Sequence, residues 1–340
     1  MKVLNITDEF GIDDGVSVHV TDLSEGLKKY NCENMILMGK IRNSVNNGEI
    51  FESHLLYHSN RSTTNFLKAI KFLADFVTAN KIDIINSHSH YSANIAKYAS
   101  FLSKVKTIQT NHGLLSKPGL LKEFNADKII LTNEHSYARY NKNNAVLIKH
   151  GLKYLPFDET KFIRPVKIFS SSRFVKEKNI EFYIRLANQF RDFKDVEFFL
   201  AGDGEQKDYL LELNKTLGGN VKYLGIVSDF ISILDTSAIY IYPSVSANEG
   251  FPISLLQAGM CSNLILTSDF LGLSENFENK KDGIIINTYD FQENVNLLSN
   301  IINNINSYIS LAENYHKRVS RDYSFDEMIE KHFKLYSSLL

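Results

Sequence analysis

The fold of this chain is decided by residues 238–257, which read Ala238-Ile-Tyr-Ile-Tyr242-Pro-Ser-Val-Ser-Ala-Asn-Glu249-Gly250-Phe251-Pro252-Ile-Ser-Leu-Leu-Gln257. The apolar run 238–242 predicts a buried strand, and residues 253–260 predict a helix. A loop that carries a carboxylate and a glycine joins the two. In α/β sheets ligands bind at the carboxyl ends of strands, and a helix that begins there offers free backbone N–H groups to anionic or hydroxyl-rich ligands. The stretch therefore indicates a ligand site in an α/β protein.

Strand-like runs alternate with helical patterns along the rest of the chain. The runs lie at residues 2–6, 33–38, 82–85, 106–110, 129–132 and 145–148, and then at 167–170, 196–200, 221–225, 239–242, 265–268 and 283–286. Such alternation indicates doubly wound parallel sheets. Because 340 residues suffice for two separate cores, we expect one α/β domain at 1–150 and a second at 151–323, with 151–165 as a linker.

The composition is that of an ordinary soluble globular protein, with 44% hydrophobic and 23% charged residues. Cys32 and Cys261 have no disulfide or metal-ligand spacing, which favours a reducing compartment. Thr7-Asp8-Glu9 follows the first apolar run, unlike a signal peptide, and no apolar run approaches the roughly 20 residues of a spanning helix. We expect a cytoplasmic protein, with a position at the inner face of the membrane as an open alternative.

Positive charge concentrates in one part of the first domain. Residues 61–149 hold 13 lysines and arginines against 5 aspartates and glutamates, a local charge of +8. This charge could face phosphates or anionic lipid, or it could be a set of solvated lysines. The segment Leu114–Phe124 alternates apolar and basic residues, so it is either a peripheral membrane contact or a loop whose leucines pack inward.

Two basic residues follow the first strand of the second domain. Arg173 and Lys178 would lie on the loop after the strand and at the start of the next helix. Arginine meets phosphate oxygens with a planar fork of donors, and lysine meets them as a point charge. The pair therefore predicts binding of a diphosphate.

Histidines and a glycine occupy loop positions in the first domain. Gly15 precedes a helical pattern after the first strand, and His88, His90 and His112 follow two later strands. A metal site made by these histidines is a competing interpretation. No cysteine or carboxylate with ligand spacing lies near them and the sequence contains no Asp-x-Asp, so we expect no metal.

Glu249-Gly-Phe-Pro, followed by Gln257 eight positions later, resembles the E-x7-E signature of the retaining GT-B glycosyltransferases of family 4. Thr110-Asn-His112-Gly113 resembles the family's His-Gly segment, and residues 149–152 resemble its domain crossover. The resemblance implies two Rossmann-like doubly wound domains that face each other across a cleft. Residues 1–150 would be the acceptor side, 151–323 the nucleotide-sugar donor side, and 324–340 a terminal helix that packs back on the N-terminal domain.

The resemblance also implies roles for individual residues. The catalytic group would consist of Arg173, Lys178, Glu249 and His112. The donor-binding group would consist of Gly15, Asp203, Gly204, Val227, Gly250, Phe251, Pro252, Ile253 and Gln257. His88 and His90 would lie on the acceptor side.

A family 4 enzyme would move a hexose-type sugar from a nucleotide sugar, with UDP the favoured nucleotide, to a glycan or lipid-linked acceptor. The resemblance places such a reaction in surface polysaccharide or glycoconjugate synthesis, with retention of the anomeric configuration. Cations that stabilise the leaving diphosphate would do the main catalytic work, so we expect no metal, no cofactor and no nucleic-acid partner.

Three positions depart from the family pattern. Gln257 stands where a second glutamate is usual, and Ser262 and Leu264 stand where a glycine and a proline are usual. A neutral amide lacks the charge assistance of a carboxylate, which predicts donor binding weaker by roughly 1–2 kcal/mol. Two alternatives remain open: a non-catalytic GT-B protein that binds glycan or a partner, and a GT-B UDP-sugar epimerase. The epimerase needs paired acid and base carboxylates in the cleft, and Glu249 is the only loop carboxylate that the sequence places there.

Overall fold

The computed structural model describes residues 1–11, 14–41, 50–115, 126–140, 142–246 and 251–340. The chain divides into two compact units. Unit 1 consists of Met1–Gly151 together with Phe325–Leu340, and unit 2 consists of Leu152–Ser324. The division lies one residue beyond the position 150 expected from the sequence. The last helix, α11 (Phe325–Ser337), belongs to unit 1 although it follows unit 2 in the chain.

Within the described residues, unit 1 contains a seven-stranded parallel sheet in the order β3-β2-β1-β4-β5-β6-β7. The strands are β1 (Lys2–Phe10), β2 (Glu33–Ile41), β3 (Ile50–Glu52), β4 (Ile84–Ser87), β5 (Lys106–Asn111), β6 (Lys128–Leu131) and β7 (Ala145–Leu147). The strand order reverses between β1 and β4, and in a doubly wound sheet such a switch point is where ligands bind.

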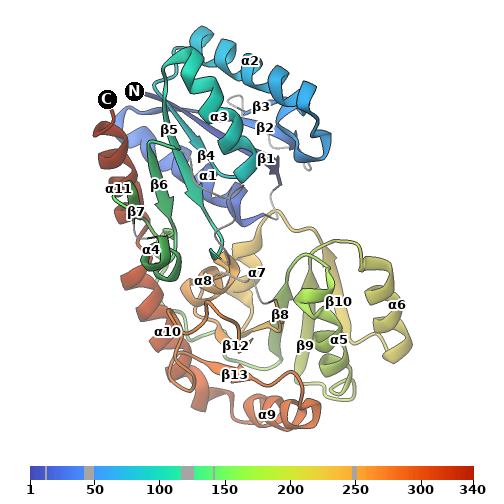
Figure 1. Ribbon diagram of the computed structural model, residues 1–340. Coiled ribbons are helices and arrows are strands. Elements are labelled where there is room, and N and C mark those ends of the chain that lie inside the picture. Colours follow the sequence, from blue (N-terminus) through green and yellow to red (C-terminus); the bar gives the residue numbers. More distant parts are fainter. Residues whose placement is uncertain (12–13, 42–49, 116–125, 141, 247–250) are drawn as a thin grey trace. The chain divides into compact units, whose positions relative to one another are not determined.

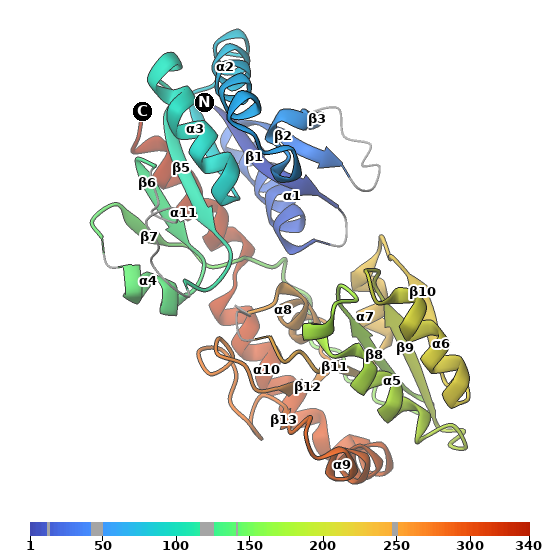
Figure 2. The ribbon, with the colours of Figure 1, turned by 45° about the vertical axis from the view of Figure 1, so that its right-hand side comes forward.

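Helices cover both faces of this sheet (Figures 1 and 2). Leu4 packs in a cluster with α2 (Thr63–Ala79) and α3 (His90–Ser103). The next residue toward the N-terminus, Val3, packs in a second cluster with α1 (Gly15–Leu27) and α11. Because successive side chains of a strand point to opposite faces, a strand buried on both faces is apolar throughout, as Val3 to Ile6 nearly is. The short helix α4 (Glu134–Tyr140) follows β6.

Strand β1 is longer than the sequence suggests. The strand-like run predicted from the sequence ends at residue 6, which would leave residues 7–10 in a loop, but β1 continues through polar residues to Phe10, where it still pairs with β2. Phe10 is buried and anchors this extension. The expectation of a loop over residues 7–10 was wrong because the neighbouring strand β2 extends to Ile41 and supplies backbone partners.

Unit 2 contains a six-stranded parallel sheet in the order β10-β9-β8-β11-β12-β13, counted over the described residues. The strands are β8 (Val166–Ser171), β9 (Val196–Ala201), β10 (Val221–Gly225), β11 (Ile239–Tyr242), β12 (Leu264–Ser268) and β13 (Ile284–Ile286). The order reverses between β8 and β11. The stretch 238–257 therefore leaves the sheet at the switch point of unit 2.

The helices of unit 2 again form two layers (Figure 2). One core cluster joins the sheet to α5 (Ile180–Asn188) and α9 (Phe291–Asn303), and the other joins it to α7 (Phe230–Thr236), α8 (Ile253–Met260) and α10 (Ile309–Asp322). The remaining helix, α6 (Lys207–Leu217), packs beside α5. The strand predicted from the apolar run 238–242 is observed at 239–242, and the predicted helix at 253–260 is confirmed with the same bounds.

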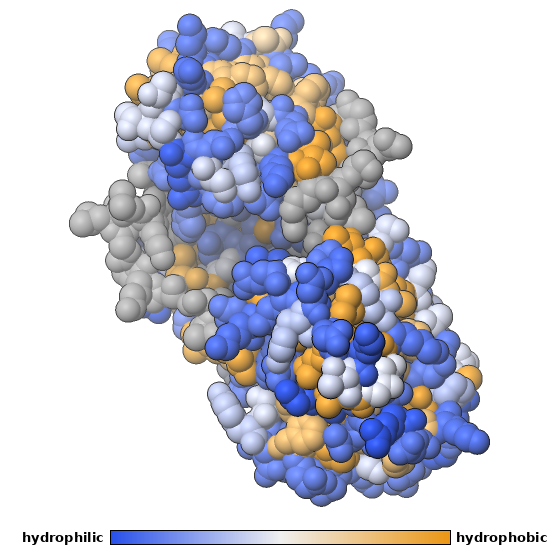
Figure 3. All heavy atoms as spheres, turned by 90° about the vertical axis from the view of Figure 1, so that its right-hand side faces the viewer, coloured by the Kyte–Doolittle hydropathy of each residue, from blue (hydrophilic) through white to orange (hydrophobic). Residues whose placement is uncertain are grey.

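The surface in Figure 3 is hydrophilic over most of the part that is described, with apolar patches between the polar side chains. Over that part of the chain, no helix combines the length and the apolarity needed to cross a membrane.

Candidate functional site

The predicted diphosphate ligands of unit 2 lie at its switch point. Arg173 follows β8, and Lys178 ends a 3-10 turn (Lys176–Lys178) that leads into α5. The Lys178 Nζ atom donates a hydrogen bond to the Tyr242 hydroxyl at 2.7 Å and lies 5.3 Å from the centre of its ring. Tyr242 is the last residue of β11, so this contact joins the loops on either side of the switch point.

A backbone hydrogen bond strengthens the same connection. The amide of Val245 donates to the carbonyl of Glu177 at 2.8 Å, and the Ser244 hydroxyl donates to that carbonyl at 3.2 Å. The loop after β8 and the loop after β11 are therefore held together before any ligand binds. Arg173 remains exposed and forms no ion pair within the described residues, so its guanidinium is free to meet an anion.

The loop after β9 packs against the backbone of Phe174, the residue that follows Arg173. Gly204 has a φ of +154°, and a Cβ atom there would lie 2.7 Å from the backbone N and O atoms of Phe174. The Phe174 amide also donates to the Asp203 carbonyl at 2.8 Å. Glycine is required at position 204 because the two backbones touch. Asp203 itself hydrogen-bonds Lys207, which lowers the pKa of its carboxyl.

Helix α8 begins at this site, as the sequence predicted. Pro252 is its N-cap residue, and Phe251, Ile253 and Gln257 are half-buried at its start and on its second turn. The first turn of a helix leaves backbone N–H groups without intrahelical partners, so hydroxyls or phosphates can bind there. Val227 packs against the apolar cluster to which α8 contributes. Glu249 and Gly250, which were predicted to contact the sugar, lie outside the described residues.

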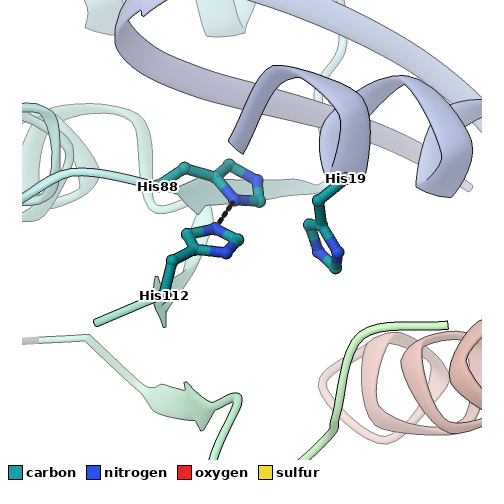
Figure 4. A group of neighbouring side chains, drawn as sticks. All are labelled: His19, His88 and His112. Carbon is teal, nitrogen blue, oxygen red and sulfur yellow. Dashed lines mark hydrogen bonds between the residues drawn. The ribbon is translucent and has the colours of Figure 1, made fainter. Parts of the chain in front are cut away.

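Unit 1 brings five histidines together at the carboxyl edge of its sheet. They are His19 in α1, His88 after β4, His112 after β5, His150 after β7 and His332 in α11. We call this group the histidine cluster. All are buried except His112, which is half-buried. Figure 4 shows His88 and His112 joined by a hydrogen bond, with the His19 ring beside them. One ring nitrogen of each of the three residues lies within 4.8 Å of the other two.

Burial keeps the histidine cluster uncharged. Loss of solvation lowers the pKa to about 3 for His88 and to about 4 for His150 and His332. It also holds the pKa of His19 and His112 well below the ordinary value, and neighbouring imidazoles add to the effect. The five rings are therefore neutral at physiological pH, when they can accept hydrogen bonds or coordinate a metal.

His90 and Gly15 do not join the cluster. His90 is exposed as the first residue of α3, where its Nδ1 atom lies 3.3 Å from Gln109, rather than in the predicted loop. Gly15 is the first residue of α1, and Asp14 caps that helix by accepting from the Ser17 amide at 3.1 Å. Sequence reasoning placed His88 and His112 at strand ends correctly. It missed His19 and His332, because neither follows a strand.

Asp8 is a further candidate that the sequence did not single out. Its carboxylate accepts a hydrogen bond from the Ser89 hydroxyl at 2.8 Å, beside His88. Burial raises the pKa of Asp8 above its ordinary value. A half-buried carboxylate at the end of a central strand can accept a hydrogen bond from a substrate hydroxyl. The polar run Thr7-Asp8-Glu9 was the available signal.

Two family models match the chain. The model described as Glycosyltransferase Family 4 matches residues 14–152, and the model described as Glycosyl transferases group 1 matches residues 155–318. Their matches meet within four residues of the division between units 1 and 2.

Curated relatives are similar over parts of their length. The N,N'-diacetylbacillosaminyl-diphospho-undecaprenol alpha-1,3-N-acetylgalactosaminyltransferase of Campylobacter jejuni is 26% identical over 50% of this chain and 44% of its own. An uncharacterized glycosyltransferase of Haemophilus influenzae is 22% identical over 60% of each chain. The chain thus spans about half the length of these two relatives. An uncharacterized glycosyltransferase of Methanocaldococcus jannaschii is 22% identical over 99% of this chain and 98% of its own.

Solved structures share the fold over nearly the whole chain. The Anabaena protein HepE, solved in complex with UDP and glucose, has a TM-score of 0.77 at 15% identity, covering 99% of this chain and 100% of its own. Sucrose-phosphate synthase from Thermosynechococcus elongatus has a TM-score of 0.77 at 16% identity, covering 99% and 98%. At sequence identities this low, the similarity shows a shared fold alone.

Proposed function

Because the chain belongs to the family 4 glycosyltransferases of the GT-B fold, we propose that it transfers a hexose-type sugar from a UDP-sugar to a glycan or lipid-linked acceptor. The observation that carries this proposal is that Arg173 and Lys178 both follow β8 at the switch point of unit 2. Hydrogen bonds among the described residues already hold the loops after β8 and β11 together. A preformed cationic site needs little reorganisation when a diphosphate arrives.

In the proposed reaction the bond between the sugar's anomeric carbon and the UDP oxygen breaks. The acceptor oxygen bonds to that carbon on the same face, and its proton passes to the leaving phosphate oxygen. The anomeric configuration is retained, and no protein nucleophile is required. Arg173 and Lys178 stabilise the negative charge that develops on UDP, with charge-assisted hydrogen bonds in place of a metal ion.

Unit 1 supplies the acceptor side in this proposal. His88 and Asp8 lie at the carboxyl ends of β4 and β1, where a hydroxyl-bearing acceptor can hydrogen-bond. His112 retains the role that the family resemblance gives it, beside the donor hexose. The name of the Campylobacter jejuni relative specifies a diphospho-undecaprenol acceptor for that protein. A lipid-linked acceptor of this kind would bring the present chain to a membrane surface.

An exposed apolar face in unit 1 supports this membrane contact. Helices α2 and α3 pack side by side, and Leu67, Tyr98, Phe101 and Leu102 are exposed on them. Exposed lysines flank these side chains at positions 68, 71 and 104. Apolar side chains beside positive charge match an anionic lipid surface. Most of the segment Leu114–Phe124, for which membrane contact and an inward-packed loop were both left open, lies outside the described residues, so the choice between them rests on sequence.

Flotation with anionic liposomes tests the membrane contact. We expect the wild-type chain to float at low salt and the double variant Phe101→Ser/Leu102→Ser to lose most of this binding. The matched control is Tyr289→Ser, which removes an exposed aromatic side chain of unit 2. No flotation of the wild type, or equal losses in both variants, would show that α2 and α3 do not contact lipid.

A panel of UDP-, GDP-, ADP- and dTDP-sugars tests the reaction itself. The readouts are thermal stabilisation and slow hydrolysis of the donor, measured with EDTA present. One UDP-sugar that stabilises the protein and is also hydrolysed is the expected result. Stabilisation without hydrolysis would favour a non-catalytic binding protein. A donor that acts only after addition of magnesium would contradict the metal-independent mechanism.

A further inference from the structure

The histidine cluster contains more imidazole than the proposed transfer reaction uses. Only His112 and His88 have a role in that reaction, yet His19, His150 and His332 are also buried against them. Burying a polar ring costs free energy unless its nitrogen atoms have partners. The unused nitrogen atoms of the cluster therefore need a binding partner.

The hydrogen bonds assign the protons of His88 and His112. Asn5 donates its amide to Asn34 Oδ1 at 3.4 Å, so its Oδ1 atom is free to accept from His88 Nε2 at 3.2 Å. His88 Nδ1 then carries a lone pair and accepts from His112 Nε2 at 2.9 Å. Because His112 is neutral, its Nδ1 atom carries a lone pair, and that buried atom has no partner among the described residues.

His19 and His332 show the same pattern. His332 Nδ1 donates to the Met328 carbonyl at 2.8 Å, which leaves a lone pair on its Nε2 atom. His19 Nδ1 shares a hydrogen bond of 3.2 Å with His150 Nδ1. In the described part of unit 1, the Nε2 atoms of both His19 and His332 are buried without a partner. Buried nitrogen atoms in this state cost about 1–3 kcal/mol each unless a water or an ion satisfies them.

We propose that His19, His88 and His112 bind one divalent transition-metal ion of the zinc class, with water or an external ligand in the fourth position. One ligand nitrogen from each of the three residues lies within 4.8 Å of the other two. In a tetrahedral zinc site with bonds of about 2.1 Å, ligand nitrogens are about 3.4 Å apart. The ligand nitrogens therefore have to move by up to about 1.4 Å, and the hydrogen bond between His112 Nε2 and His88 Nδ1 has to break so that the His88 Nδ1 lone pair can bind the ion.

The surroundings of the three residues fit this kind of ion. Imidazole nitrogen selects zinc, cobalt, nickel or copper over magnesium and calcium, which prefer oxygen ligands. A metal-bound histidine commonly donates its second ring N–H to an oxygen acceptor that fixes its orientation. His88 does this through Nε2 to Asn5 Oδ1, and His150 contacts the second nitrogen of His19. Of the three proposed ligands, His112 is half-buried and the other two are buried.

Metal binding would control transfer. An ion on His112 would withdraw that imidazole from the donor sugar, so zinc would inhibit the enzyme. This consequence rests on the proposed function, whereas the binding itself does not. Zinc inhibition and metal-independent catalysis are compatible, because the ion would occupy unit 1 and not the diphosphate site of unit 2.

The binding test uses the untagged, full-length protein after treatment with EDTA and removal of the chelator. We expect one equivalent of bound zinc, and a cobalt-loaded form with the visible absorption of a tetrahedral site. His88→Ala and His19→Gln should each lower bound zinc at least tenfold. The matched control His54→Ala, which removes an exposed histidine outside the cluster, should retain it. No zinc bound to the wild type, or equal loss in the control, would overturn the proposal.

The cobalt spectrum of the wild type tests the proposed tetrahedral site even if a variant fails to fold, because an octahedral spectrum would exclude that site. Activity distinguishes the two claims. If zinc binds in one equivalent but does not slow transfer, the metal site holds and the assigned role of His112 is wrong. If no zinc binds while UDP-sugar transfer proceeds, the metal proposal is wrong and the proposed function remains.

Discussion

Mild acid should unfold unit 1 of the metal-free protein while it leaves unit 2 folded. The perturbation is a change from pH 7 to pH 5, and the groups that respond are the five members of the histidine cluster, four of which are buried while His112 is half-buried. Their pKa is lowered by burial, to about 3 or 4 for His88, His150 and His332. In the unfolded chain the same side chains have a pKa of about 6.5.

The direction of the change in stability depends on whether the folded or the unfolded state binds protons at the higher pH. As the pH falls below about 6.5, the histidines of the unfolded chain bind protons that the folded cluster does not bind, so the free energy of unfolding falls. The loss continues until the folded rings themselves protonate near pH 3–4. Between pH 7 and pH 5, each histidine that stays unprotonated in the folded state lowers the free energy of unfolding by about 2 kcal/mol. The three groups with stated values together cost about 6 kcal/mol, a large part of the 5–15 kcal/mol that stabilises a typical domain.

Urea unfolding in EDTA at pH 7, 6 and 5, followed by circular dichroism, measures this effect. Unit 2 serves as an internal control, because its sequence contains a single histidine, His316. We expect the transition of unit 1 to move to lower urea and that of unit 2 to stay. His332→Leu should reduce the acid loss by about 2 kcal/mol, the share of one histidine, and His54→Ala should leave it unchanged. A transition of unit 1 that changes by less than about 1 kcal/mol between pH 7 and pH 5 would refute the reasoning.

Two further predictions concern unit 2. Gln257→Glu should tighten UDP binding by about 5- to 30-fold, because a carboxylate accepts hydrogen bonds from the ribose hydroxyls with charge assistance. Calorimetry measures this affinity, with the exposed Gln189→Glu as the control. An unchanged or weaker affinity of Gln257→Glu would contradict the prediction. Gly204→Ala should destabilise unit 2 by at least about 2 kcal/mol, because its Cβ would collide with the Phe174 backbone and its φ of +154° strains any other residue. Gly219→Ala, at a φ of +75° in open space, should cost only about 1 kcal/mol, and equal losses in urea unfolding would count against the collision.

Local patterns predicted most of the fold. Strand β11 and helix α8 have the predicted bounds, because an uninterrupted apolar run and a Pro252 boundary are strong local signals. Strand β3 was missed, since Ile50–Glu52 has only three residues and two of them are exposed. β1 runs past its predicted end because its pairing with β2, a contact between distant segments, determines where it stops.

The candidate site could be predicted only where its residues follow strands. His88, His112, Arg173 and Lys178 all come directly after a strand or on the following loop, so sequence reasoning found them. The meeting of His19 with His332 joins residues more than 300 positions apart, which no spacing rule shows. The expectation of no metal was also based on neighbours in the sequence, and it stays a prediction that zinc binding tests.

The affinity of UDP for unit 2 tests the central claim most directly. Calorimetry on the wild type, Lys178→Met and Lys176→Met compares a lysine at the switch point with an exposed lysine of the same turn. A hydrogen bond to a charged group contributes about 1.5–3 kcal/mol, so Lys178→Met should weaken UDP binding about 10- to 150-fold while Lys176→Met leaves it unchanged. A wild type that does not bind UDP, or two variants that lose affinity equally, would contradict the assignment of this site to a nucleotide-sugar donor.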